Sequence, residues 1–182
     1  MSALVLALAV LVLVQVAIRE SRDDPPARAT GSPTAAVVSQ SGLLGPGDPF
    51  PSFTAPAMGG GRISWTQFVG TPTLVAVWAP WCPHCQAELP VLASVIEGFP
   101  SVRLLTVATA VDPHLGPTPR RYMRAAGLDF PVALDDPAGT LARALRVQAF
   151  PTLYFVDAGG TIRVVHQGEM PAEDVRSMLR SL

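Results

Sequence analysis

The two cysteines of this chain, Cys82 and Cys85, stand two residues apart between a strand-like and a helix-like segment. Residues 73–78 before them form a continuous apolar run rich in β-branched side chains, which predicts a buried strand. From Leu89 to Phe99, large apolar side chains recur at helical spacing, which predicts a helix. The cysteines are therefore expected at a strand-to-helix turn, which constrains the chain to an α/β fold.

A dithiol at such a turn can exchange a disulfide with another protein. Cys82 would lie at the helix N-terminus, where free backbone N–H groups and the helix dipole favour a thiolate, the form that attacks disulfides. Cys85, one helical turn later, can then displace the captured sulfur. Both cysteines are predicted to be catalytic, in an enzyme of the protein thiol–disulfide oxidoreductase class, and this chemistry requires no cofactor.

The sequence gives less support to two other uses of a cysteine pair. A static disulfide across so short a loop would remove little chain entropy. A zinc site would need further ligands, but the chain has no third cysteine, and nothing in the sequence pairs His114 or His166 with the motif. We therefore expect no metal. The formal net charge of −1 gives no indication of nucleic-acid binding.

The N-terminal part predicts an anchor and a tether. Residues 1–18 are almost entirely apolar, and as a helix they would just reach across a hydrocarbon core. We expect a transmembrane anchor in contact with lipid; a signal peptide cleaved near Ala27-Arg28-Ala29 is the alternative. Residues 19–47 are rich in Pro, Ser, Ala, Thr and Gly, which predicts a flexible tether to a domain over residues 48–182.

Within residues 48–182, strand-like and helix-like patterns alternate. Gly59-Gly60-Gly61 indicates an early hairpin, and Asp157-Ala158-Gly159-Gly160 indicates another between the last two strands. Asp136-Pro137 predicts a helix start with proline at the first position, and Asp135 is a predicted turn and capping residue. The expected fold is α/β, with a central mixed sheet covered by helices on both faces. Further strands are predicted at 102–109, 130–134, 152–156 and 161–165, and further helices at 65–68, at 120–126 and from 171 onward.

These motifs resemble those of a known family. Trp78-Ala79-Pro80-Trp81 followed by the cysteine pair is similar to the thioredoxin superfamily. The continuation Gln86–Pro90, the segment Phe150-Pro151-Thr152 and an insert around 110–128 resemble its membrane-tethered, extracytoplasmic branch, the TlpA/ResA-like disulfide reductases. The resemblance covers residues 48–182 and implies a thioredoxin-like fold with an N-terminal hairpin extension and a helical insert.

The resemblance also implies a substrate-binding position opposite the cysteine pair. The family has a cis proline there, and it matches Pro151, between Phe150 and Thr152. An X–Pro bond tolerates the cis form, and a proline at the start of a strand leaves an outward edge free to pair with an extended substrate segment. We expect these three residues to contact substrate; an ordinary trans proline in a loop is the alternative.

One departure from the family concerns proton transfer. Thioredoxins proper carry a buried aspartate where this chain has Ala76, and alanine cannot relay a proton. Glu88, one helical turn beyond Cys85, matches the glutamate that has this role in the reductase branch. We therefore expect Glu88 to be the base that serves Cys85. The alternative is a solvated helix residue with no such task.

The other departure is the Pro83-His84 dipeptide, which is similar to that of the DsbA-like disulfide oxidases. His84 can offer a hydrogen bond or a positive charge to the Cys82 thiolate, which stabilises the reduced form and makes the disulfide a stronger oxidant. Trp81 is expected to shield Cys82 or to contact substrate. The scaffold thus favours a reductase, whereas the dipeptide favours an oxidase.

The expected function is that of an extracytoplasmic, single-pass membrane protein that exchanges disulfides with substrate proteins, as a reductase in the maturation of cytochrome c or another metalloprotein. The implied partners are proteins with cysteines or disulfides and a membrane thiol electron donor or acceptor. One alternative is a DsbA-like oxidase. Another is a peroxiredoxin-like peroxidase, although Ala79 stands where those enzymes have threonine or serine. A third is a copper(I) carrier that binds through both cysteines and a histidine.

Overall fold

The computed structural model describes residues 42–182. The predicted anchor over residues 1–18, and most of the predicted tether over residues 19–47, lie outside this range. Among the described residues, no helix combines the length and the apolar character that crossing a membrane requires. The anchor and the tether therefore stay predictions.

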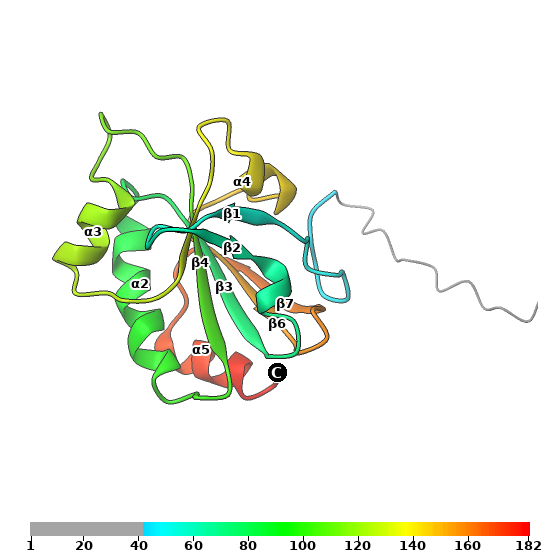
Figure 1. Ribbon diagram of the computed structural model, residues 1–182. Helices are drawn as coiled ribbons and strands as arrows, with labels where there is room; N and C mark the ends of the chain where they lie inside the picture. Colours follow the sequence, from blue (N-terminus) through cyan, green and yellow to red (C-terminus); the bar gives the residue numbers. More distant parts are fainter. Residues whose placement is uncertain (1–41) are drawn as a thin grey trace, which may run out of the picture. The chain divides into compact units, whose positions relative to one another are not determined.

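A five-stranded mixed sheet forms the centre of the described domain, in the order β5-β4-β3-β6-β7 (Figure 1). β3 (Thr73–Trp78) lies in the middle, runs parallel to β4 and antiparallel to β6, and has all six residues buried. The predicted mixed sheet and the predicted buried strand before the cysteines are thus confirmed. The other strands are β4 (Arg103–Ala108), β5 (Val132–Leu134), β6 (Thr152–Val156) and β7 (Ile162–Gln167).

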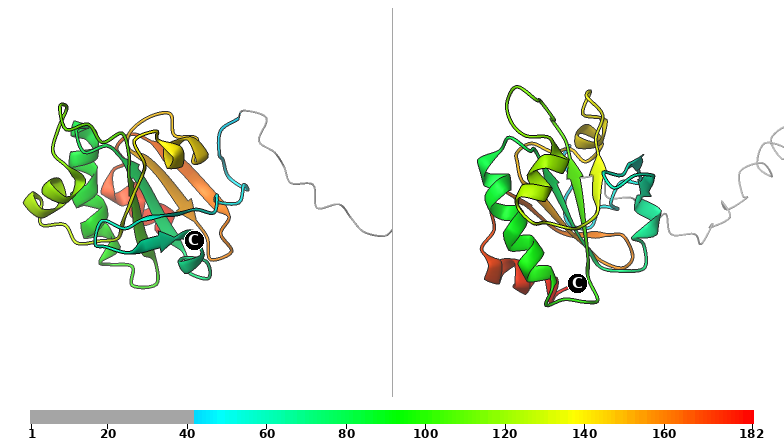
Figure 2. Two further views of the ribbon diagram at one scale, coloured as in Figure 1. Left: turned by 45° about the horizontal axis from the view of Figure 1, so that its top comes forward. Right: turned by 60° about the vertical axis from the view of Figure 1, so that its left-hand side comes forward.

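Each face of the sheet is covered by its own layer (Figure 2). Side chains alternate along β3, so Leu74, Ala76 and Trp78 enter one hydrophobic cluster, whereas Val75 and Val77 enter the other. Three helices complete the first cluster: α2 (Pro83–Ile96), α3 (Pro119–Ala125) and α5 (Ala172–Leu179). The second is completed by the predicted hairpin β1 (Thr54–Pro56) with β2 (Arg62–Ser64), the single turn η1 (Trp65–Gln67) and α4 (Thr140–Ala144).

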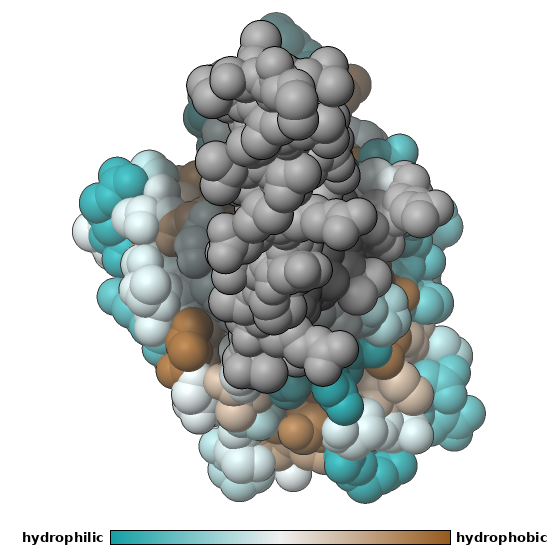
Figure 3. All heavy atoms as spheres, turned by 90° about the vertical axis from the view of Figure 1, so that its right-hand side faces the viewer, coloured by the Kyte–Doolittle hydropathy of each residue, from teal (hydrophilic) through white to brown (hydrophobic). Residues whose placement is uncertain are grey.

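Large apolar side chains of the described residues lie mostly inside these two clusters. On the visible part of the face in Figure 3, hydrophobic residues occur in small patches between polar ones. Four large hydrophobic residues of the described range are exposed: Leu43, Val69, Val111 and Leu115. Two of these four, Val111 and Leu115, belong to the loop between β4 and α3, which borders the cysteine pair.

α4 begins at Thr140, later than the sequence pattern predicts. Pro137 is not the first helical residue as predicted, because the chain first makes a turn that ends at Gly139, whose φ of 69° lies in the left-handed region. The predicted capping role of Asp136 is confirmed, since its Oδ1 atom accepts a hydrogen bond from the Thr140 N–H at 3.0 Å. The carboxylate of Asp135 reaches over this turn and accepts hydrogen bonds from two N–H groups of the first helical turn, at 2.7 and 3.0 Å. The predicted capping role of Asp135 is confirmed, but it acts across the turn.

We expect Asp135→Ala to lower the free energy of unfolding by about 2 kcal/mol. The substitution removes the acceptor of two helix N–H groups and of the Thr109 hydroxyl, which donates to Asp135 at 2.7 Å. Urea unfolding followed by circular dichroism measures the change. Asp129→Ala, at an exposed position of the loop before β5, is the matched control and should cost less than about 0.5 kcal/mol. Equal losses in the two variants would contradict the capping role.

Candidate redox site

The cysteine pair lies where β3 leads into α2, as predicted. Cys82 is the N-cap residue of α2, and Pro83 occupies the first helical position, where its missing N–H costs no hydrogen bond. Cys82 is 6% exposed, whereas Cys85, one turn into the helix, is fully buried. Both are free thiols. Of the two sulfurs, that of Cys82 is therefore the one that a substrate can reach.

Burial also decides the acidity of the Cys85 thiol. Burial raises the pKa of the Cys85 thiol far above its ordinary value, because a thiolate in this position would lose its hydration. The adjacent Cys82 thiol adds to the increase. Cys85 therefore stays protonated until a base removes its proton. A buried, protonated thiol fits the predicted role of Cys85, which resolves the mixed disulfide after Cys82 has attacked.

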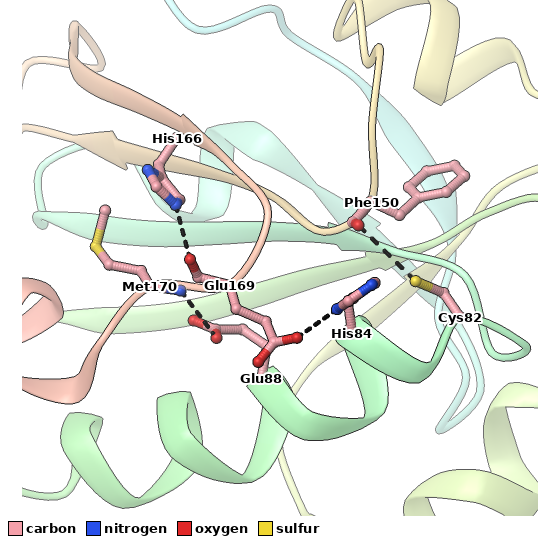
Figure 4. Close-up of polar contacts among 7 residues, drawn as sticks. All are labelled: Cys82, His84, Glu88, Phe150, His166, Glu169 and Met170. Atoms are coloured by element: carbon pink, nitrogen blue, oxygen red, sulfur yellow. Dashed lines mark hydrogen bonds and ion pairs between the residues drawn. The ribbon is translucent and has the colours of Figure 1, made fainter.

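The Phe150–Pro151 segment lies against Cys82. Its peptide bond is cis, as the resemblance implies, and the Cys82 thiol donates to the Phe150 carbonyl oxygen with the sulfur at 3.8 Å (Figure 4). Thr152 begins β6 and is buried, and its hydroxyl donates to the Ala149 carbonyl oxygen at 2.6 Å. The expectation that Pro151 opens a strand with a free outward edge is wrong, because β6 pairs with β3 on one side and with β7 on the other. Substrate contact at Phe150, Pro151 and Thr152 stays a prediction.

Trp81 is held between two segments that are distant in sequence. Its indole N–H donates to the Ala110 carbonyl oxygen at 2.7 Å, and its ring meets that of Phe150 edge-on, with centroids 6.1 Å apart. Gly116 packs so closely that a Cβ atom there would come within 2.8 Å of the Trp81 Cα and Cβ atoms. The loop between β4 and α3 therefore fixes Trp81 beside the cysteine pair.

Glu88 is only 2% exposed, so the alternative of a solvated helix residue is wrong. Its Oε2 atom accepts a hydrogen bond from the Met170 N–H at 3.1 Å, whereas Oε1 is buried without a partner in residues 42–182. Burial raises the pKa of the Glu88 carboxyl; the Met170 N–H lowers it less, and the charge of Glu169 adds to the increase. A carboxyl that titrates closer to neutral pH suits a proton-transfer role.

No hydrogen bond joins Glu88 to Cys85 within the described residues. A proton that passes between them therefore needs a bridging group, and one water molecule has the required chemistry. The unpartnered Oε1 atom of Glu88 is available as its acceptor. The structure thus shows a buried carboxyl with one unpartnered oxygen, and its role as the base that serves Cys85 stays a prediction.

His84 is exposed and forms an ion pair with Glu169, with Nδ1 and Oε1 2.5 Å apart (Figure 4). The Glu169 carbonyl oxygen in turn accepts a hydrogen bond from Nε2 of His166, at 2.9 Å. Glu169, Met170 and His166 are functional candidates that the sequence analysis missed. Two of them, Glu169 and Met170, lie in the short connection between β7 and α5.

The predicted order of the last strands already indicated that these residues lie near the cysteine pair. The second predicted hairpin, β6–β7, places Thr152 opposite Gln167. The residues that follow Gln167 must therefore return to the end of the sheet where Pro151 and the cysteine pair lie. The connection between β7 and α5 was predictable as part of the site, but its individual contacts were not.

Within residues 42–182, no group of three or more His, Cys, Asp or Glu residues is placed to hold a metal ion. His84 is paired with Glu169, and His166 bonds to a backbone carbonyl. The arrangement contains instead one reachable thiol, one buried thiol and one buried carboxyl. These are the parts that thiol–disulfide exchange requires.

Comparison with known proteins gives a consistent assignment. Residues 46–165 match the AhpC/TSA family. The chain is 30% identical over 109 residues to sporulation thiol-disulfide oxidoreductase A of Bacillus subtilis, a match that covers 59% of this chain and 66% of that protein, just under two thirds of its length. It is 29% identical over 142 residues to the thiol:disulfide interchange protein DsbE of Xylella fastidiosa, covering 77% of this chain and 69% of that one.

A solved structure supports the same grouping. The secreted Mycobacterium tuberculosis disulfide oxidoreductase described as homologous to E. coli DsbE has a TM-score of 0.63 and 26% identity, over 71% of this chain and 96% of that one. The thioredoxin-like fold is thereby confirmed. Because the family match extends over well more than half of the 182 residues, the chain belongs to the AhpC/TSA family of the thioredoxin superfamily, with relatives named thiol–disulfide oxidoreductases.

Proposed function

We propose that the protein is a thiol–disulfide oxidoreductase that reduces disulfides of substrate proteins on the extracytoplasmic side of a membrane. The observation that carries this proposal is the inequivalence of the two thiols: Cys82 is 6% exposed, while Cys85 is fully buried and its pKa is raised. The names of the relatives, which refer to disulfide exchange, support the reaction class.

In the reductive direction, the Cys82 thiolate attacks one sulfur of a substrate disulfide and expels the other as a thiolate, which takes up a proton. Cys85 then loses its proton to Glu88 and attacks the Cys82 sulfur, so the second substrate cysteine leaves. The substrate gains two electrons and two protons, and the cysteine pair becomes a disulfide. A membrane thiol donor would return the two electrons.

An apolar rim beside Cys82 supports a protein as the substrate. Trp81 and Phe150 lie edge to face next to Cys82, and Val111 and Leu115 are exposed in the loop that holds the Trp81 indole. An extended chain with apolar side chains beside its cysteine would cover this rim and remove it from water. A protein awaiting cofactor attachment, such as an unfolded cytochrome c, presents such a chain, and we propose this class of substrate.

The proposed location rests on the N-terminal sequence and on the relatives. Residues 1–18 have the apolar character of a membrane anchor, and residues 19–47 have the composition of a tether. One structural relative is described as secreted, which supports an extracytoplasmic site of action. We therefore propose a single-pass membrane protein with its redox domain outside the cytoplasm.

A DsbA-like oxidase is the second candidate, favoured by the position of His84 in the first turn of α2, two residues after Cys82. The reduction potential of the full chain, equilibrated with reduced and oxidised glutathione, distinguishes the two. We expect a value near about −270 mV, as in thioredoxin. A value near about −120 mV would show an oxidase and contradict the proposal.

A further inference from the structure

Three successive residues after β7 contact three different parts of the site, and Figure 4 shows the contacts of the last two, Glu169 and Met170. We call Gly168–Met170 the bridging segment. Its first and last residues form hydrogen bonds with the cis-proline segment and with the buried carboxyl of Glu88. Its middle residue, Glu169, contacts His84 of the cysteine motif. The contacts are Gly168 N–H to the Pro151 carbonyl oxygen at 2.8 Å, Glu169 Oε1 to His84 Nδ1 at 2.5 Å, and Met170 N–H to Glu88 Oε2 at 3.1 Å.

The contact between Glu169 and His84 determines how much positive charge His84 can offer to the Cys82 thiolate. His84 lies in the first turn of α2, two residues after Cys82 at the N-cap. A protonated imidazole there stabilises the Cys82 thiolate and thereby the reduced form, which raises the reduction potential. The Glu169 carboxylate, however, lies 2.5 Å from the ring, so the imidazolium and the carboxylate together carry no net charge. The thiolate gains much less from such a pair than from an imidazolium alone.

We propose that Glu169 is a positioning residue that pairs with His84 and neutralises the positive charge that the histidine would otherwise offer to the Cys82 thiolate. This neutralisation keeps the reduction potential of the cysteine pair low. The inference rests on the proposed function, because it explains how a chain with an oxidase-like dipeptide works as a reductase. It also gives the bridging segment a function besides packing, because the N–H groups of Gly168 and Met170 donate hydrogen bonds on either side of Glu169 and so hold it in place.

The effect depends on pH, because His84 has to be protonated to act. An imidazole carries more positive charge at pH 6 than at pH 8, so loss of the Glu169 carboxylate should have the larger effect at pH 6. The other titratable groups around the pair are Glu88 on α2 and His166 on β7, and both stay unchanged in the test.

The test is a double-mutant cycle on the full chain at pH 6. The equilibrium is enzyme disulfide plus two glutathione thiols against enzyme dithiol plus glutathione disulfide. We expect Glu169→Gln to shift this equilibrium about tenfold toward the dithiol, which corresponds to about 30 mV, and to speed alkylation of Cys82 by iodoacetamide. In a His84→Asn background, the same Glu169→Gln change should shift the equilibrium less than about threefold.

Glu97→Gln is the matched control, because it removes one exposed carboxylate at the other end of α2 and should leave the equilibrium unchanged. An unchanged equilibrium in Glu169→Gln would overturn the inference and leave the proposed function standing. A tenfold shift that persists without His84 would overturn it as well, because Glu169 would then act directly on Cys82. A failure of every variant and of the parent chain to exchange with glutathione would instead overturn the proposed function.

Discussion

Replacing Cys85 with serine is expected to trap the protein on its substrate. Cys82 keeps its reachable position at the N-cap of α2 and can still attack a disulfide. The second step is lost, because a serine hydroxyl does not displace a sulfur from the mixed disulfide. Incubation with a disulfide-bonded protein should yield a covalent adduct through Cys82, visible on a non-reducing gel and released by dithiothreitol.

The matched variant is Cys82→Ser, which keeps the buried thiol of Cys85. We expect it to form no adduct and to reduce disulfides at least about 10³-fold more slowly than the parent, because the remaining thiol is buried and its raised pKa keeps it protonated. An adduct of equal yield in the two variants would show that the sulfurs are interchangeable. That result would contradict the assignment of attack to Cys82.

Glu88→Gln is expected to slow release of substrate from the mixed disulfide by about 10²-fold at pH 7. The amide has nearly the shape of the carboxyl and can still accept the Met170 N–H, but it cannot take the proton of Cys85. In the parent, the rate of release should rise with pH as the Glu88 carboxyl ionises, because its ionised form is the base. Rapid-quench measurement of the mixed disulfide between pH 5 and pH 8 would show this rise disappear in the variant.

The same substitution should make the fold more stable at high pH. Burial raises the pKa of Glu88 in the folded state, so the folded protein binds this proton more tightly than the unfolded chain does. The stability that this provides is complete below the unfolded pKa and is lost as the pH rises through the folded value. At pH 8, Glu88→Gln should therefore raise the free energy of unfolding by about 1 kcal/mol, with a smaller gain at pH 4.

If Glu88→Gln releases substrate more slowly and is also more stable, then Glu88 has a chemical role and not only a structural one. If Glu88 served only to hold the Met170 N–H, glutamine would preserve both the rate and the fold. Urea unfolding at pH 4 and pH 8 therefore complements the kinetic measurement. Unchanged release kinetics in a stabilised variant would contradict the role of Glu88 as the base.

Local patterns were sufficient to predict the framework of the site. The uninterrupted apolar run of residues 73–78 identified β3, because a strand with both faces covered has no polar side to alternate with. Glycine-rich turns identified both hairpins, and the spacing of Cys82 and Cys85 located the strand-to-helix turn. Each of these features depends on neighbours within a few residues in the chain.

Details that depend on a distant partner were predicted less well. Asp136-Pro137 satisfies the pattern for a helix start, yet α4 begins later, since the Asp135 carboxylate caps it from across a turn. Glu88 could be read from sequence as either buried or solvated. Its burial follows from packing against the connection between β7 and α5, which lies 82 positions away in sequence.

The sequence by itself determined an α/β domain with a dithiol at the end of a buried strand, because those features follow from short-range periodicity and spacing; its resemblance to the thioredoxin superfamily implied the rest of the fold. Only the tertiary structure decided which charges surround that dithiol. His84 and Glu169 are 85 positions apart in sequence and meet because the β6–β7 hairpin returns the chain to the cysteine pair. Electrostatic effects fall with distance in space, whatever the separation along the chain.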